Sequence, residues 1–130
     1  MEEPIWVSPA VVLAIHDEQI AAHGGSDGIR DERLLDSALA RPQNLPAYGD
    51  PDIFDLAAAY AAGIVHNHPF VDGNKRASFV TTLLFLALNG YQITASEDAR
   101  VLIWLGLADG SKDEAALAAW LRKFSAPIEP

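Results

Sequence analysis

The chain of 130 residues contains no cysteine, which excludes a disulfide framework and any metal site built on thiolates. Basic residues are scarce as well, because 9 Lys and Arg stand against 18 Asp and Glu, for a net charge of −9. An acidic surface repels nucleic acid at long range, so we expect no direct nucleic-acid partner. The absence of cysteine fits a reducing compartment, and we expect a cytoplasmic location.

Long hydrophobic runs are missing too. The longest nearly apolar run, residues 77–88, is shorter than the ~20 residues that span a bilayer. The first four residues include two glutamates and lack the apolar core of a signal peptide, so we expect no membrane association. Hydrophobic residues nevertheless make up 50% of the chain, which argues against disorder. We therefore expect one domain over residues 1–130.

Helix signals dominate the chain, and we expect an all-α bundle of about six helices with a minor two-stranded β element. Ser8 and Pro9 begin the first helix, Pro42 ends the second, and a capping box from Ser111 to Glu114 begins the sixth. The expected helices cover residues 9–23, 26 or 31 to 40, 53–66, 74–89, 97–109 and 112–124. Residues 91–93 are expected to form a strand that pairs with residues 5–7.

The third and fourth expected helices are apolar on nearly every face, which is typical of helices at the centre of a domain. Any short polar turn would be enough to join them. Residues 67–76 instead contain a histidine, an aspartate, two asparagines, a glycine and two cations. This concentration of chemically active groups between two buried helices predicts a functional loop.

Two cations, Lys75 and Arg76, lie in the first turn of the fourth helix. The helix dipole disfavours a cation there by ~0.3–1 kcal/mol, so the pair indicates a bound anion. Backbone N–H groups at Gly73 and Asn74 would point at a phosphate. Asp72 is placed to hold Mg²⁺ on the same phosphates. His68 is placed to accept a proton from an incoming hydroxyl group.

Two other interpretations of this loop remain open. In the first, Asp72 or Asn74 only caps the helix, and the two cations are solvated. In the second, His66, His68 and Asp72 bind zinc or iron, although no fourth ligand is identified.

The segment from His68 to Arg76, HPFVDGNKR, resembles the signature of the Fic family, HPFx(D/E)GN(G/K)R. Residues 23–42 and 89–91 resemble the Doc (death-on-curing) branch of that family, and the likeness extends from about residue 8 to 124. The resemblance implies a single Fic/Doc domain, with a Fic-type bundle in which two central apolar helices flank the active loop.

The resemblance also implies roles for individual residues. His68 matches the general base of the family, Asp72 the Mg²⁺ ligand and Phe70 the anchor of the loop. The residues that it implies for binding the phosphates of ATP are Gly73, Asn74, Lys75 and Arg76.

In the Doc branch, the resemblance implies a toxin of a toxin–antitoxin pair. Such a toxin moves the γ-phosphate of ATP onto a threonine of translation elongation factor Tu. Lys75 replaces the second glycine of adenylyl-transferring members, and Phe79 replaces their second arginine. Both replacements favour phosphate transfer over the alternative, AMP transfer. A second alternative is a non-catalytic module that only binds an anion, and His68 argues against it.

The resemblance also implies a partner and a substrate-binding segment. The chain has no inhibitory motif of the form (S/T)xxxE(G/N), so restraint is expected from an antitoxin of the Phd type. Residues 43–52 correspond to a flap that aligns the target by strand addition, and residues 45–48 are expected either to do this or to be a plain connector.

Overall fold

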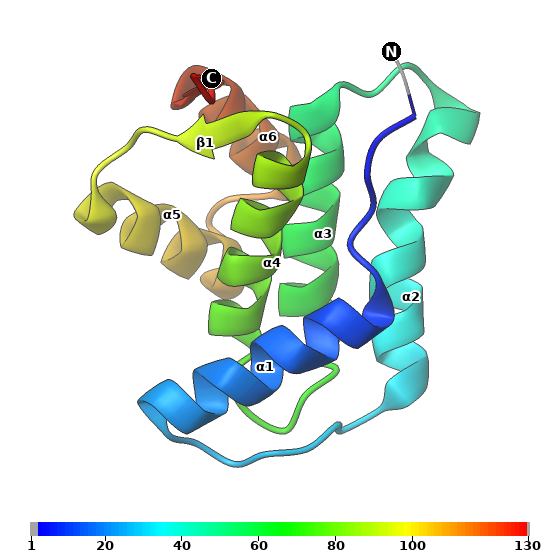
Figure 1. Cartoon of the computed structure of the whole chain (residues 1–130), viewed down its shortest axis with the longest axis vertical. Helices are drawn as coiled ribbons and strands as arrows, with labels where there is room; N and C mark the ends of the chain where they lie inside the picture. The colour runs from blue at the N-terminus through cyan, green and yellow to red at the C-terminus, as the bar shows by residue number, and fades with distance from the viewer. Residues whose placement is uncertain (1–2, 130) are drawn as a thin grey trace.

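The structure is a computed structural model, and it describes residues 3–129. It confirms the all-α architecture, with α3 and α4 side by side at the centre and α1 crossing near one end (Figure 1). The α-helices are α1 (Pro9–His23), α2 (Glu32–Asn44), α3 (Ile53–Asn67), α4 (Asn74–Leu88), α5 (Glu97–Asp109) and α6 (Glu114–Lys123). The other elements are a 3₁₀ helix, η1 (Leu45–Tyr48), and two strands, β1 (Tyr91–Ile93) and β2 (Ser125–Pro127).

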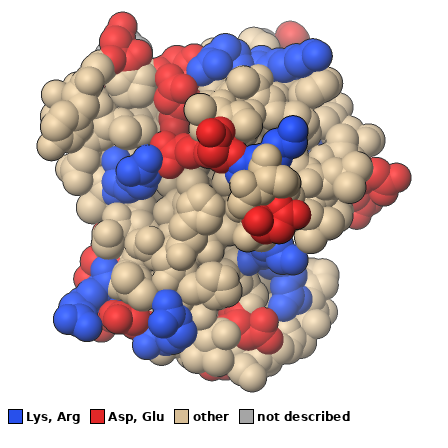
Figure 2. All heavy atoms as spheres, turned by 180° about the vertical axis from the view of Figure 1, so that it is seen from behind, with Lys and Arg blue, Asp and Glu red and all other residues tan. Residues whose placement is uncertain are grey.

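Helix α3 is the centre of the hydrophobic core. Every residue from Leu56 to Val65 is buried, because α2, α4 and α6 all pack against this helix. This arrangement explains why the helix is apolar on all sides. Acidic and basic side chains are interspersed on the face seen in Figure 2. No helix within residues 3–129 has the length and apolar character needed to cross a membrane.

Helix α2 continues through Pro42 to Asn44, so the expected end at residue 40 is wrong. Proline has no N–H, and it therefore leaves the carbonyl of Ala38 without its helical partner. Helix α3 comes very close at this carbonyl, since a Cβ on Gly63 would lie 3.0 Å from the Ala38 oxygen. Helix α2 therefore continues past Pro42, and the backbone of α3 packs against the turn that lacks a hydrogen bond.

Residues 45–48 form the 3₁₀ helix η1 and are not extended here, so strand addition by this segment stays a prediction that would require a change of conformation. A 3₁₀ turn directs its backbone groups along the chain, whereas strand addition needs an extended row of free N–H and C=O groups. Tyr48 is 88% exposed at the end of this turn.

Strand β1 pairs with β2 and not with residues 5–7, which corrects the second β prediction. The backbone of Ile5 is bound instead by one side chain, since Asn89 accepts from its N–H at 2.9 Å and donates to its carbonyl at 3.0 Å. The hydroxyl of Tyr60 accepts from the N–H of Val7 at 3.0 Å. Side chains therefore bind the backbone groups that a strand partner would have bound.

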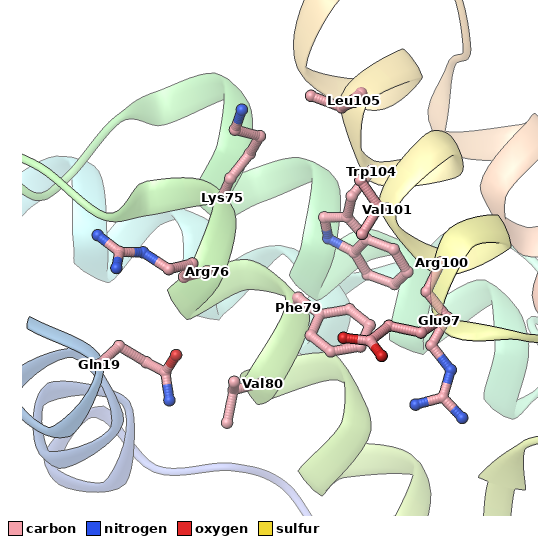
Figure 3. Close-up of a pocket in the computed structure, with 10 residues that line it drawn as sticks. All are labelled: Gln19, Lys75, Arg76, Phe79, Val80, Glu97, Arg100, Val101, Trp104 and Leu105. Carbon is pink, nitrogen blue, oxygen red and sulfur yellow. The ribbon is translucent and has the colours of Figure 1, made fainter. Parts of the chain in front are cut away.

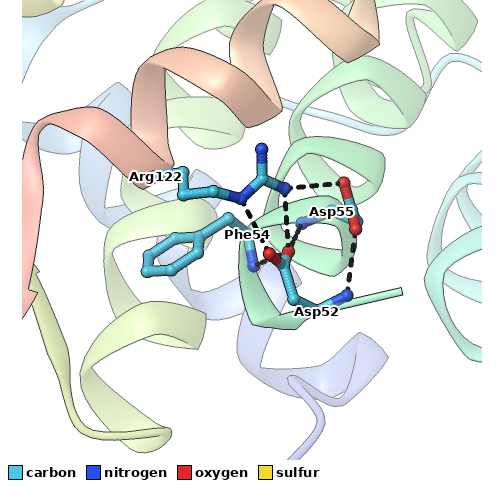
Figure 4. A network of polar contacts seen from close by, with 4 residues as sticks. All are labelled: Asp52, Phe54, Asp55 and Arg122. Carbon is cyan, nitrogen blue, oxygen red and sulfur yellow. Dashed lines mark hydrogen bonds and ion pairs between the residues drawn. The ribbon is translucent and has the colours of Figure 1, made fainter. Parts of the chain in front are cut away.

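Helix α6 is capped by Asp113, not by Ser111, so the expected capping box is misplaced by two residues. The Ser111 N–H is bound to the side chain of Asp109 at 2.8 Å, in the turn after α5. The capping box that the structure does contain begins α3. There Asp52 and Asp55 bind each other's N–H groups, and Arg122 pairs with both carboxylates (Figure 4).

Candidate active site

The active loop begins with an unusual backbone conformation at His68. This residue follows α3 with a φ of 51°, and it is the one non-glycine residue with a positive φ among residues 3–129. Its N–H donates to the carbonyl of Ile64 at 3.2 Å, which closes the last turn of the helix. A left-handed conformation is costly for a residue with a side chain and is often found at functional sites. The backbone conformation of His68 is therefore consistent with a functional role for this residue.

A segment preceding α2, residues 24–31, lies along the loop and is called the strap here. Its Arg30 donates through Nε to the carbonyl of His68 at 2.7 Å and through a terminal nitrogen to that of Asn67 at 2.9 Å. The Arg30 N–H also donates to the carbonyl of Pro69 at 2.7 Å. One residue therefore fixes three successive carbonyl groups around the histidine.

The strap also reaches the carboxylate of the loop. Val71 donates its N–H to the carbonyl of Gly28 at 3.1 Å, and Asp72 accepts from the N–H of Ser26 at 3.3 Å. A Cβ on Gly25 would lie 2.6 Å from the Asp72 carboxylate, so only glycine fits there. The strap was not predicted as part of the site, although its three glycines, at positions 24, 25 and 28, were the available signal.

Asn74 connects the two ends of the loop from inside. Its side chain is buried, its carbonyl accepts from the Phe70 N–H at 3.0 Å, and its NH₂ group donates to the Phe70 carbonyl at 3.0 Å. The same NH₂ group lies 3.1 Å from Nδ1 of His68. Nδ1 must then accept, so the neutral imidazole carries its proton on Nε2. Only the backbone N–H of Asn74 remains for a phosphate.

Helix α4 begins without a side-chain cap, because Gly73 occupies that position. The first hydrogen bond of the helix runs from the Ala77 N–H to Gly73, so the N–H groups of residues 74–76 precede it. No side chain within residues 3–129 accepts from these groups. Asp72 binds Gly73 and Ser26 instead, and the interpretation of Asp72 or Asn74 as a helix cap is therefore wrong.

The carboxylate of Asp72 is held ionised. The N–H of Gly73, 2.8 Å away, lowers its pKa most, and the N–H of Ser26 and the charge of Arg76 lower the pKa further. The side chain lies in a hollow of about 430 Å³, which His68 and the first residues of α4 also line. One hollow is thus lined by the six residues that were predicted to catalyse transfer or to bind phosphate and Mg²⁺, namely His68, Asp72, Gly73, Asn74, Lys75 and Arg76.

A second hollow, of about 470 Å³, lies between α4 and α5 (Figure 3). Lys75 and Arg76 line both hollows, so the two adjoin. Phe79 and Trp104 form an apolar wall of the second one, with their rings at 89° and 4.9 Å between centroids. Phe79 is the residue that replaces a second arginine, so this wall offers no second guanidinium at that position.

The structure does not support the metal site that His66 would share with His68 and Asp72. The ring of His66 points to α5, where its Nε2 lies 3.3 Å from the carbonyl of Leu107. Among residues 3–129, the one group of three potential ligands within reach of one another is His16, Asp17 and Asp27. The interpretation that assigned the loop to zinc or iron is therefore wrong.

Comparison with known proteins agrees with this geometry. A family model described as the Fic/DOC family matches residues 6–86. The chain belongs to the Fic/Doc family. It is 32% identical over 124 residues to "Protein kinase doc" of Escherichia phage P1, which covers 95% of this chain and 98% of that protein. It is 43% identical over 81 residues to "Toxin Doc" of Mycolicibacterium smegmatis, or 59% of this chain and 61% of that protein.

These likenesses place the chain in the Doc branch of the Fic/Doc family, as the loop and the segments at 23–42 and 89–91 predicted. The match to the phage protein extends over nearly all of both chains, so it includes the strap and α5 as well as the loop.

Proposed function

We propose that this protein is a Doc-type toxin that transfers the γ-phosphate of ATP to a hydroxyl group of a protein, with a threonine of elongation factor Tu as the target. One observation carries the proposal. The uncapped, cationic start of α4 shares a hollow with an ionised carboxylate and an exposed histidine. A helix start of this kind binds phosphate groups, and the neighbouring side chains supply what a transfer reaction needs.

The phosphates are held by the N–H groups of residues 74–76 and by Lys75 and Arg76. The Arg76 guanidinium is steadied by the carbonyl of Gly24, 3.1 Å away. Asp72 fits a magnesium ion, because Mg²⁺ in phosphate sites is commonly bound by one or two carboxylates and the substrate phosphates. The ion, when bound, neutralises charge on the phosphates.

His68 accepts the proton in the proposed reaction. The target oxygen bonds to the γ-phosphorus, the bond from that phosphorus to the bridging oxygen breaks, and ADP leaves. A ring nitrogen must be free to take the proton of the hydroxyl group. In the resting arrangement that nitrogen is Nδ1, which Asn74 occupies. The proposal therefore includes release of this hydrogen bond when the target hydroxyl binds.

Phosphate transfer is favoured over AMP transfer by two features of α4. Lys75 adds bulk and charge where a glycine would leave room for a deeper nucleotide. Phe79 contributes to an apolar wall against Trp104, so this position supplies no second arginine. The terminal phosphate is then the group that most easily reaches His68.

The partner that restrains the toxin is proposed to be a Phd-type antitoxin whose tail occupies the hollow between α4 and α5. Val101 and Leu105 line this hollow from α5 and are 53% and 43% exposed, which gives an apolar surface for a helix. An internal brake is not evident. Ser125 and Glu129 have the spacing of the inhibitory motif, but Ser125 begins β2 and Pro130 follows Glu129.

The proposal is tested by incubating the protein with a bacterial lysate, Mg²⁺ and ATP labelled on either the γ- or the α-phosphate. Label from γ-labelled ATP on one protein, and a mass increase of one phosphate, are expected. Label from α-labelled ATP would show AMP transfer instead. His68→Ala should reduce the label ~10²–10⁴-fold while ATP binding persists. No label from either nucleotide, with ATP still bound, would leave only an anion-binding module.

A further inference from the structure

A buried histidine outside the loop contacts it directly and has no part in the proposed reaction. His16 lies in the middle of α1 and is 1% exposed. Its ring stacks on Phe70, with 3.8 Å between centroids and 4° between planes. Its Nε2 lies 2.8 Å from the backbone carbonyl of Asp72. Both contacts of the side chain are therefore with the active loop.

The hydrogen bond fixes the protonation of the ring. A carbonyl oxygen can only accept, so Nε2 carries a hydrogen and donates it, and Nδ1 of the neutral ring is bare. The peptide group between Asp72 and Gly73 is consequently bound at both ends. His16 binds its oxygen, and the Asp72 carboxylate binds its N–H at 2.8 Å. Gly73 has a φ of 77°, so this peptide is the turn that leads into α4.

No side chain within residues 3–129 donates a hydrogen bond to the Asp72 carboxylate, whose two hydrogen bonds come from the backbone N–H groups of Ser26 and Gly73. Rotation of the peptide between Asp72 and Gly73 would move this carboxylate and the first N–H groups of α4 together. A leucine or phenylalanine at position 16 would fill the same space but would not prevent that rotation. The donor nitrogen is what distinguishes His16 from an ordinary core residue.

We propose that His16 is a positioning residue of the site. It fixes the peptide between Asp72 and Gly73, and through that peptide it sets the carboxylate against the phosphate-binding start of α4. The inference rests on the proposed function, because it assumes that Asp72 and α4 hold Mg²⁺ and phosphate. Groups of this kind, one step removed from a metal, typically change metal affinity or activity ~10–100-fold when they are lost.

The main test compares His16→Phe, which keeps the stacking on Phe70 and removes the donor, with the wild-type protein. Calorimetry measures ATP affinity with Mg²⁺ and with a chelator. The gain in affinity on adding Mg²⁺ should fall ~10–100-fold in His16→Phe. Affinity in the chelator should change little, because the N–H groups of α4 remain. An unchanged Mg²⁺ gain would overturn the proposal.

A control separates positioning from stability. Val12 is fully buried on the same helix and is not part of the loop hollow, so Val12→Ala should lower Tm without altering the Mg²⁺ gain. If Val12→Ala, at a matched loss of Tm, reduces the Mg²⁺ gain as much as His16→Phe does, the effect comes from stability and the proposal fails. His16→Gln, which restores a donor, should recover part of the gain.

A second readout needs neither nucleotide nor target. Nitrogen-15 NMR of the histidines should show His16 with its proton on Nε2, and the Gly73 amide signal should shift in His16→Phe but not in Val12→Ala. A proton on Nδ1 of His16, or an unmoved Gly73 signal, would overturn the proposal even if the transfer reaction is confirmed. If no transfer is found, the proposed function fails, while these signals still decide whether His16 fixes the loop.

Discussion

The two central helices begin in opposite ways. The start of α3 is satisfied by its own chain, because the Asp52 carboxylate accepts from the N–H groups of Phe54 and Asp55 at 3.0 and 2.9 Å. Arg122 then binds that carboxylate at 2.8 Å (Figure 4). The start of α4 has neither a cap nor an acidic residue in its first turn. The same positive helix end is therefore neutralised in α3 and left open in α4.

This difference separates stability from function in neighbouring parts of one molecule. Burial alone would raise the pKa of Asp52, but the hydrogen bonds from Arg122 and from the Asp55 N–H bring it below its ordinary value. Asp52 and Arg122 thus form an ion pair of complementary charges at the start of α3. The cations at α4 have no such complement in the first turn, and the missing partner is what we assign to a phosphate.

The largest effect is expected at the open helix start. Arg76→Ala should reduce phosphate transfer ~10²–10³-fold, as the loss of a charge-stabilising donor does in other active sites. Its Tm should stay close to the wild-type value, because α4 gains nothing from this cation. Arg33→Ala is the matched control, since that side chain is 92% exposed and its one ion pair among residues 3–129 is with Asp31. A large loss of Tm in Arg76→Ala would instead assign Arg76 to the fold.

Lys75→Glu is expected to have a smaller effect, which raises the stability of α4 and weakens ATP binding. A carboxylate in the first turn should stabilise α4 by ~0.3–1 kcal/mol through the helix dipole. It should also weaken ATP binding ~10–100-fold, because a hydrogen bond to a charged group is replaced by repulsion. Thermal unfolding and calorimetry measure the two changes. A variant that is less stable and binds ATP normally would contradict the comparison.

A substitution at the capped start of α3 should lower stability and leave transfer activity unchanged. Asp52→Ala should lower the free energy of unfolding by ~1–2 kcal/mol, because it removes a cap and half of the ion pair. Transfer activity per folded molecule should be unchanged, since Asp52 lies at the far end of α3 from His68. Urea unfolding and the labelling assay provide the two values. Loss of activity without loss of stability would show that the two helix starts are not independent.

The smallest effect is a pH dependence of the same cap. The pKa of Asp52 is lower in the folded protein than its ordinary value, so ionised Asp52 stabilises the fold above that ordinary value. The stabilisation is lost as the pH falls through the lowered pKa. Asp52→Asn keeps a capping oxygen but no charge. The stability gap between this variant and the wild type should therefore close in acid, and a gap that widens there would refute the assignment.

Local patterns were enough to predict the helices and the loop. The continuous apolar stretches fixed α3 and α4, and the polar residues between them are the ones that share the hollow. Which distant segments pair with each other could not be predicted from local patterns. The partner of β1 is residues 125–127, which have no strand pattern, and Asn89 takes over the backbone of Ile5. The N-cap of α6 could not be predicted either, because Ser111 and Asp113 are both good capping residues and lie two positions apart.

The parts of the site that were missed depend on contacts across the chain. His16 is 56 residues from Asp72, and Arg30 is 38 residues from His68. Neither separation leaves a spacing signal. Pro42 was misread for a related reason, because only the close approach of α3 at Gly63 shows why the helix can continue past it.

The anchoring of both described chain ends has a practical consequence. Ile5 is bound to Asn89, and the N–H of Ile128 donates to the carbonyl of Gly90 at 2.9 Å, so both ends are held just after the last turn of α4. The active loop lies at the first turn of the same helix, ~20 Å away for 15 residues (Figure 1). A fluorophore, an affinity handle or a surface linker joined at either end would project from the pole opposite the loop, which would leave that loop facing free solution in immobilised or single-molecule assays.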